Sequence, residues 1–136
     1  MKYSRNKLQE LAVICVYQHL FYNSEEKKVK TKEILEQVTE LKYEKIDSFL
    51  KLLFKSVILN INEIVDEISA NLVDWEFKRL NKVEQAILLC GYAQTVYMEQ
   101  PKTVAIDVSV ELAKKYGGDE SYKYINGVLD KCLKDN

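Results

Sequence analysis

The feature that most constrains the fold of this chain is a series of helix start and stop signals in residues 79–130. Asn81 is followed three residues later by Glu84, a spacing at which the two side chains satisfy amide donors at the start of a helix. Segment 114–117 reads Lys-Lys-Tyr-Gly, and cations in a last turn followed by glycine are typical of a helix end. Pro101 interrupts the chain between these two signals. They predict two consecutive helices, with room for a third beyond residue 117.

The rest of the chain also carries apolar residues at helical spacing. The third C-terminal helix is expected after Asp119, which can cap it. Near the N-terminus, a largely buried helix is expected to begin near Ser4, and Thr31 could cap a short helix. Residues 43–60 carry a strong amphipathic pattern, which is repeated after a break at 60–62. The pattern therefore predicts helices along nearly the whole sequence.

One segment is ambiguous from its pattern alone. In residues 103–110, apolar side chains occupy every second position from Val104 to Val110, which favours a strand. A helix is equally compatible, because Glu111 and Lys115 just beyond are spaced as an i, i+4 ion pair. The residues by themselves leave both structures open.

Composition indicates a globular chain rather than a disordered one. The 136 residues include one proline and four glycines, with 47% hydrophobic and 30% charged residues. This length suits one domain with a substantial core. The formal net charge is −1, so any binding to nucleic acid must come from a local cationic surface rather than from bulk charge.

The sequence carries no arrangement typical of catalysis or metal binding. His19 is the only histidine, and the cysteines at 15, 90 and 132 lie far apart within apolar patterns. We interpret the cysteines as small buried hydrophobes in a reducing cytoplasm. Phosphate-binding glycine loops and nucleophile motifs do not occur. We therefore expect a non-catalytic cytoplasmic protein without a cofactor or metal, and no apolar run approaches the length of a membrane span.

Four stretches of the C-terminal half form an ordered combination. They are Val83-Glu84-Gln85-Ala86-Ile87-Leu88, Pro101-Lys102-Thr103-Val104-Ala105-Ile106-Asp107, Val110-Glu111-Leu112-Ala113-Lys114-Lys115-Tyr116-Gly117 and Lys123-Tyr124-Ile125-Asn126-Gly127-Val128-Leu129-Asp130. In order and spacing they resemble the NusB antitermination factors, apart from one apparent deletion before Pro101. Trp75 and the pair Arg79-Leu80 also lie where that family has them.

The resemblance implies an all-α, NusB-like fold of about seven helices. The helices would form two small bundles within one compact domain over residues 1–136, divided near residues 23–43 or 73–81. It also favours the helix for residues 103–110. In function it implies an RNA-binding antitermination factor that pairs with the small-subunit ribosomal protein acting as NusE. The pair would bind single-stranded boxA RNA of ribosomal RNA transcripts and join the RNA polymerase antitermination complex.

Two sets of residues take roles from this resemblance. The partner-binding surface would include Glu84 and Glu120. The RNA-binding residues would be Lys2, Arg5, Lys7, Tyr17, Lys123, Tyr124 and Asn126. Unpaired bases stack on aromatic rings while cations hold the phosphates, which gives these residue types their role. The residues alone leave core packing open for Tyr17 and Tyr124.

Two alternatives stay open at this point. Gln9 stands where the family usually has an arginine, and Leu89 stands where an arginine often follows the Ile-Leu pair. These changes are compatible with a helical protein-interaction module that keeps the fold without specific RNA binding. The fold also occurs as the RNA-recognition domain of an RNA cytosine methyltransferase. Because the chain contains no methyltransferase segment, we expect no such activity from it.

Overall fold

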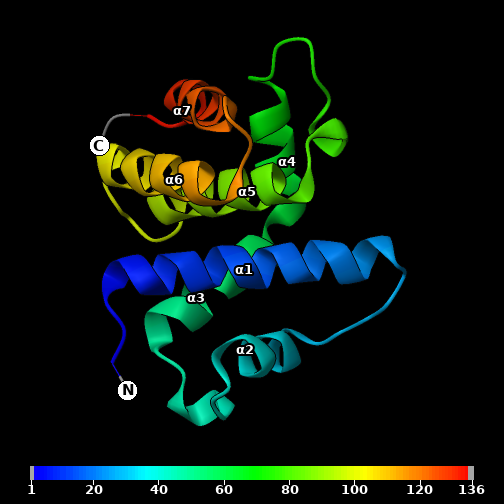
Figure 1. Cartoon of the computed structure of the whole chain (residues 1–136), viewed down its shortest axis with the longest axis vertical. Helices are drawn as coiled ribbons and strands as arrows, with labels where there is room; N and C mark the ends of the chain where they lie inside the picture. Colours follow the sequence, from blue (N-terminus) through cyan, green and yellow to red (C-terminus); the bar gives the residue numbers. More distant parts are fainter. Residues whose placement is uncertain (1, 135–136) are drawn as a thin grey trace.

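The computed structural model describes residues 2–134, which fold into seven α-helices and two short 3₁₀ helices (Figure 1). The α-helices are α1 (Arg5–Ser24), α2 (Thr31–Thr39), α3 (Ser48–Leu59), α4 (Ile61–Ser69), α5 (Lys82–Val96), α6 (Lys102–Tyr116) and α7 (Ser121–Cys132). The 3₁₀ helices are η1 (Tyr43–Lys45) and η2 (Phe77–Arg79). No strand occurs in residues 2–134, which confirms the all-α prediction, and the ambiguous segment 103–110 lies within α6.

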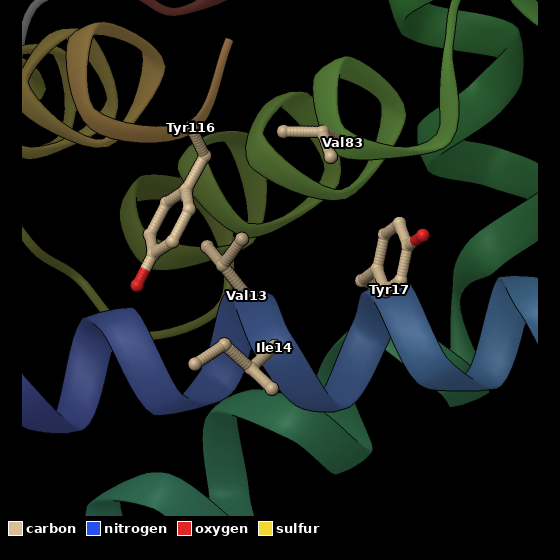
Figure 2. A pocket seen from close by; sticks show the side chains of 5 residues that line it. All are labelled: Val13, Ile14, Tyr17, Val83 and Tyr116. Atoms are coloured by element: carbon tan, nitrogen blue, oxygen red, sulfur yellow. The ribbon is translucent and has the colours of Figure 1, made fainter.

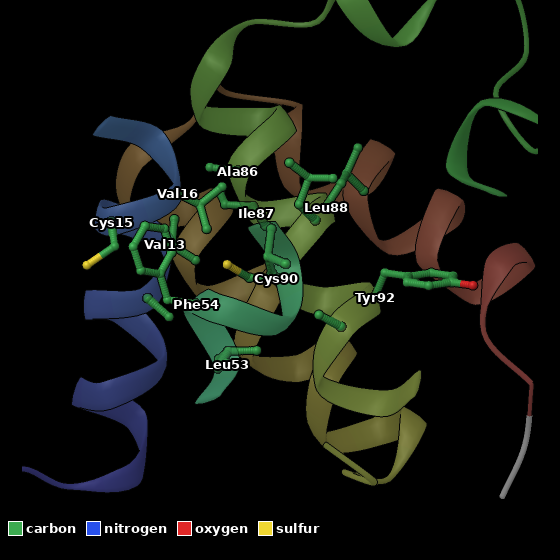
Figure 3. Close-up of a cluster of buried hydrophobic side chains, with 14 of the residues drawn as sticks. Val13, Cys15, Val16, Leu53, Phe54, Ala86, Ile87, Leu88, Cys90 and Tyr92 are labelled. Carbon is green, nitrogen blue, oxygen red and sulfur yellow. The ribbon is translucent and has the colours of Figure 1, made fainter. Parts of the chain in front are cut away.

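The centre of the fold is α5, whose middle is buried on every side. All residues from Ala86 to Thr95 are buried, as expected for a helix that is apolar around its circumference. Figure 3 shows Ile87 and Cys90 of this helix among side chains contributed by α1 and α3. Of the two buried polar residues in this stretch, Gln94 is bonded across the core, since Gln9 Nε2 donates to Gln94 Oε1 at 2.6 Å. The Thr95 hydroxyl is buried without a hydrogen-bond partner among the described residues. The arrangement fixes α1 firmly against α5.

The helices form two groups, with α1–α3 in one and α4–α7 in the other (Figure 1). The two predicted bundles are therefore confirmed, and they meet where α1 and α3 pack against α5. The chain crosses from one group to the other at Asn60, where α3 ends and α4 begins. The predicted division near 23–43 or 73–81 was wrong, although the break at 60–62 was recognised as an interruption of the helix.

Two predicted helix starts are confirmed by their caps. Ser4 Oγ accepts from the amide of Lys7 at 3.1 Å and caps α1. Asn81 Oδ1 accepts from the amide of Glu84 at 2.8 Å, and the Glu84 carboxylate accepts from the amide of Asn81 at 3.4 Å. The capping box predicted from a four-residue pattern is thus complete.

Two other starts differ from the prediction. Thr31 is the first residue of α2 rather than its cap, and Lys30 takes the capping position without a side-chain bond. The helix expected from residue 43 begins only after Asp47, whose carboxylate caps α3. The amide of Tyr43 donates to the Glu36 carboxylate at 2.8 Å. Because this bond ties residue 43 to α2, residues 43–45 form a separate 3₁₀ turn.

The start of α7 also differs. Asp119 does not cap this helix, and Glu120 takes the capping position without a side-chain bond. The reason is tertiary, since the Ser121 hydroxyl donates to the Glu84 carboxylate at 3.0 Å and draws the first turn of α7 towards α5. Gly117 permits this approach, because a Cβ there would lie 2.7 Å from Ser121 Cβ.

Two helical glycines have opposite surroundings. A Cβ at Gly91 would lie 2.6 Å from Ser109 Oγ and 2.8 Å from Leu129 Cδ1, so α5 approaches α6 and α7 closely here. No atom lies within 4 Å of a Cβ built at Gly127. No neighbouring helix therefore approaches the backbone at Gly127, which instead lines an open pocket.

The three cysteines are free thiols within the described residues. Cys15 and Cys90 are buried, which confirms their interpretation as core residues, and Cys132 is partly buried. Burial raises the pKa of the Cys15 thiol to about 12. Among residues 2–134, no helix has both the length and the apolar character needed to cross a bilayer.

Candidate nucleic-acid interface

The residues predicted to bind RNA lie on two helices that pack on different neighbours. One set lies at the N-terminus and along α1, and the other set lies on α7. Helix α1 packs chiefly on α5 and α3, whereas α7 packs on α6 and α5 (Figure 1). The first set comprises Lys2, Arg5, Lys7 and Tyr17, and the second comprises Lys123, Tyr124 and Asn126. Any single RNA surface must therefore include whatever lies between α1 and α7.

The N-terminal cations point to different neighbours. The Arg5 guanidinium lies 3.7 Å from the centroid of the Phe49 ring on α3, in cation–π geometry. Lys7 Nζ instead pairs with Glu10 Oε1 at 3.1 Å, on the face of α1 that meets α6. Lys2 is exposed ahead of the helix. The structure therefore separates Arg5 from Lys7 rather than collecting them in one cluster.

A buried carboxylate joins α1 to the end of α6. The Glu10 side chain is only 9% exposed. Lys115 Nζ lies 2.5 Å from Glu10 Oε2, and the Tyr116 hydroxyl donates to the same oxygen at 2.6 Å. With Lys7 on the other oxygen, these hydrogen bonds favour the charged carboxylate. The bond from Lys115, followed by that from Tyr116, lowers the pKa of Glu10 to about 2.

Sequence reasoning missed Lys115 and Tyr116 as site residues. They were used only to recognise the end of a helix, which is a local signal. Their contact with Glu10 spans more than a hundred residues. The available hint was chemical, because Glu10 lies within a largely apolar helix and needs a cationic partner if it is buried.

The same region contains an apolar pocket of about 250 Å³. Figure 2 shows Tyr17 and Tyr116 at its two sides, with Val13 and Ile14 of α1 between them and Val83 of α5 opposite. Tyr17 is 37% exposed and Tyr116 is 42% exposed, so both rings reach solvent. Tyr17 is therefore not a fully buried core residue.

On α7 the accessible ring–cation grouping centres on Tyr122. Lys114 Nζ of α6 lies 5.1 Å from the Tyr122 ring centroid, and Lys123 Nζ lies 5.9 Å from it. Lys123 also pairs with Glu120 at 3.0 Å, and Asn126 is exposed one turn further on. The C-terminal turn of α6 therefore contacts both helices that carry the predicted residues, through Glu10 on α1 and through Tyr122 on α7.

Tyr124 has a different environment from Tyr122. Its ring is partly buried, and its hydroxyl oxygen is buried with no hydrogen-bond partner among the described residues. Burial, with the nearby Glu84 carboxylate, raises the pKa of Tyr124. The ring lines the pocket that contains Glu84 and also a second pocket that it shares with Lys123.

The two residues predicted to bind a partner lie in one pocket of about 400 Å³. Glu84 is held there by its capping box and by Ser121, whereas Glu120 is exposed. The structure thus brings together Glu84, Glu120 and Tyr124, three residues that the sequence divided between two surfaces. The remaining lining residues are Trp75, Arg79, Leu80, Asn81 and Ser121.

Residues 2–134 contain no group of three or more histidine, cysteine, aspartate or glutamate side chains placed to hold a metal ion. What the surface offers chemically is aromatic faces, lysine ammonium groups and two carboxylates held by hydrogen bonds, those of Glu10 and Glu84. Such groups bind and position a ligand.

Comparison with known proteins supports the resemblance. Residues 6–134 match the model of the NusB family. The transcription antitermination protein NusB of Clostridium botulinum (strain Loch Maree / Type A3) is 35% identical over 140 residues, which cover 96% of this chain and 99% of that protein. The structure of T. maritima NusB aligns with a TM-score of 0.82 at 28% identity, over 97% of this chain and 92% of that one. A structure of the antitermination factors NusB and NusE with double-stranded RNA shares the fold, with a TM-score of 0.78 at 23% identity over 94% of each chain.

Proposed function

The chain belongs to the NusB family of transcription antitermination proteins, and on that premise we propose that it binds single-stranded boxA-like RNA jointly with the ribosomal protein NusE. Members of this family are non-catalytic factors, and this chain is one of them. The pair on boxA would join the RNA polymerase antitermination complex during transcription of ribosomal RNA. The structure of NusB and NusE with double-stranded RNA supports NusE and RNA as the two partners.

The observation that carries the proposal is the row of rings and cations at the end of α6. Lys114 and Lys123 lie over the Tyr122 ring, and Lys115 Nζ lies 5.2 Å from the centroid of the Tyr116 ring. Tyr17 lines the same pocket as Tyr116. Bases stack on such rings for about 1–3 kcal/mol each, and each ammonium can hold one phosphate. A surface of this kind can bind single strands although the net charge of the whole chain is −1.

The second surface is the pocket that contains Glu84 and Glu120. Two carboxylates beside the Trp75 indole favour a cationic side chain presented by NusE. The two surfaces approach each other at the start of α7, where Glu120 pairs with Lys123. A partner held in this pocket can therefore add its own RNA contacts next to those of the chain. Two weak binding sites that hold the same strand together bind it far more tightly than either site alone.

RNA binding is tested by fluorescence anisotropy with a labelled single-stranded RNA that carries the boxA-like sequence. We expect the affinity to rise when NusE is added and to fall as the salt concentration rises. Lys7→Ala and Lys123→Ala should each reduce the slope of log K against log salt by about 0.7, the value for one phosphate contact on a single strand. Lys32→Ala is the matched control, because Lys32 is exposed on α2, across α1 from this surface.

Partner binding has its own reporter, because Trp75 is the only tryptophan and lies in the pocket. NusE should change the Trp75 emission, and Glu120→Lys should weaken that response without unfolding the exposed site. If NusE binds while the RNA shows no affinity at low salt, the chain is instead a protein-interaction module. The engagement of Arg5 with Phe49 and of Lys123 with Glu120 is the observation that favours this second function.

A further inference from the structure

We propose that the pocket between Tyr17 and Tyr116 receives one unstacked nucleobase of the bound RNA. This inference rests on the proposed function, in which Tyr17 already has an RNA-binding role through the family resemblance. What it adds is Tyr116 as the second ring and the pocket between the two rings as the place of one base. The pocket lies where the side of α1 meets the end of α6 and the start of α5 (Figure 2). In this proposal the heterocycle of one nucleotide enters the pocket, and its ribose and phosphate remain outside.

The shape and lining of the pocket suit a base. Two aromatic rings stand on opposite sides, and aliphatic side chains of Val13, Ile14 and Val83 complete the lining. The pocket volume of about 250 Å³ leaves room for one ring system between the two tyrosines. A base placed there loses contact with water and stacks on two aromatic rings. Such stacking contributes favourable binding free energy in the recognition of single strands.

The orientation of the Tyr116 ring is already fixed in the free protein. Its hydroxyl donates to the Glu10 carboxylate, which is itself fixed by Lys115 and Lys7. An exposed tyrosine normally samples several orientations, whereas this one is anchored at its far end. The ordering of the ring therefore takes place when the protein folds, and RNA binding does not bear that entropic cost.

The charged groups next to the pocket, which surround the Tyr116 hydroxyl, favour an RNA base over an apolar protein side chain. Around Glu10 there are two ammonium groups for one carboxylate, so the group carries a net positive charge. The Lys115 side chain is 59% exposed and the Lys7 side chain is 46% exposed. An ammonium has three donors, so each lysine can keep its bond to Glu10 and still donate to a phosphate. A leucine or phenylalanine of a protein partner would offer no anionic group to the Lys7 and Lys115 ammonium groups.

The test combines protein variants with an abasic scan of the boxA-like RNA. Each nucleotide is replaced in turn by an abasic one, and affinity is measured by anisotropy with NusE present. For the unmodified protein, one position should lose about 5- to 150-fold, the cost of one stacked base. Tyr116→Ala should lose a comparable factor on intact RNA. The two losses should not add, because both remove the same contact.

Two further variants separate stacking from structure. Tyr116→Phe keeps the ring and loses the bond to Glu10, so it should retain most of the affinity that Tyr116→Ala loses. Phe21→Ala is the matched control, because Phe21 is an exposed ring one turn beyond Tyr17 and does not line the pocket. Tyr116→Ala and Tyr116→Phe should both be somewhat less stable than the unmodified protein, because both lose the bond to Glu10. Both should remain folded at the assay temperature, with an unchanged Trp75 response to NusE. These readouts show whether Tyr116→Ala has damaged the fold.

The outcomes distinguish this inference from the proposed function. If the protein binds RNA and Tyr116→Ala has no effect, or its loss adds fully to that of every abasic site, the base pocket is refuted and the antitermination role stands. If Tyr116→Ala weakens NusE binding alone, the occupant is a protein side chain, which also refutes the inference. If the unmodified protein with NusE binds no RNA at low salt, both proposals fail.

Discussion

Replacing Glu10 with glutamine tests whether one buried carboxylate holds α1 to the end of α6. Glu10→Gln keeps the size of the side chain and one carbonyl oxygen but removes the charge. Lys115, Lys7 and the Tyr116 hydroxyl would then face a neutral amide instead of a carboxylate. Because charge-assisted bonds are about twice as strong as neutral ones, the variant should be less stable.

The magnitude follows from the pKa of Glu10, which falls from 4.5 to about 2 in the folded chain. A shift of that size corresponds to about 3.5 kcal/mol at most, at about 1.4 kcal/mol per unit. The lysine partners are about half exposed, so solvent screens part of the interaction. We therefore expect Glu10→Gln to lower the free energy of unfolding by about 1–2 kcal/mol near neutral pH.

The pH dependence has a definite sign. A carboxylate with a lowered folded pKa stabilises the fold above its unfolded pKa and loses that contribution as pH falls towards the folded value. The difference in stability between the unmodified protein and the Glu10→Gln variant should therefore be constant above about pH 5.5 and should shrink between about pH 4.5 and about pH 2. Urea unfolding followed by far-ultraviolet circular dichroism at several pH values measures this difference.

The control is Glu111→Gln on α6. Glu111 pairs with Lys114 at 3.8 Å, and its side chain is 75% exposed. An exposed pair of this kind should contribute less than about 1 kcal/mol. If Glu10→Gln is no more destabilising than Glu111→Gln, or if its effect grows as pH falls, the carboxylate does not hold the two helices together.

Three further predictions concern stability and are measured by urea or thermal unfolding. Asn81→Ala removes the cap of α5 and should cost about 1 kcal/mol, with Asn81→Ser retaining most of the cap. Gly127→Ala should stabilise α7 by about 0.5–1 kcal/mol, because nothing obstructs the new Cβ. Gly91→Ala should be neutral or destabilising by up to about 2 kcal/mol, because α5 lies close to α6 and α7 there. Equal effects of the two alanines would contradict the packing described at these sites. Gln94→Leu should cost about 1–3 kcal/mol by leaving the buried Gln9 amide unpaired, and adding Gln9→Leu should recover much of that loss.

The helices that the sequence predicts correctly carry their signals within one or two turns. Asn81 and Glu84 form a capping box across four residues, and no distant residue is needed to recognise it. The failed prediction at Asp119 shows the opposite case. The start of α7 depends on a bond between Ser121 and Glu84 of α5, which no local pattern contains.

The sequence predicted which kinds of side chain form the binding surface, but not all of the residues that lie on it. Tyr17 and Lys123 were identified through the family resemblance, and both are accessible. Tyr116 and Lys115 were missed because their partner, Glu10, lies at the other end of the chain. Tyr124 was also assigned to RNA through the resemblance. Its ring lines the pocket of Glu84 and also a second pocket that it shares with Lys123.

The cations of this surface explain why a partner would be needed. Lys114 and Lys123 already pair with Glu111 and Glu120, and these exposed pairs are worth less than about 1 kcal/mol each. A phosphate that replaces such a carboxylate gains little, so the chain alone should hold RNA weakly and in a salt-sensitive way. NusE bound at Glu120 would sit beside Lys123 and supply further contacts to the same strand. Discrimination between RNAs then depends on the base contacts, because the phosphate contacts are the same in every sequence.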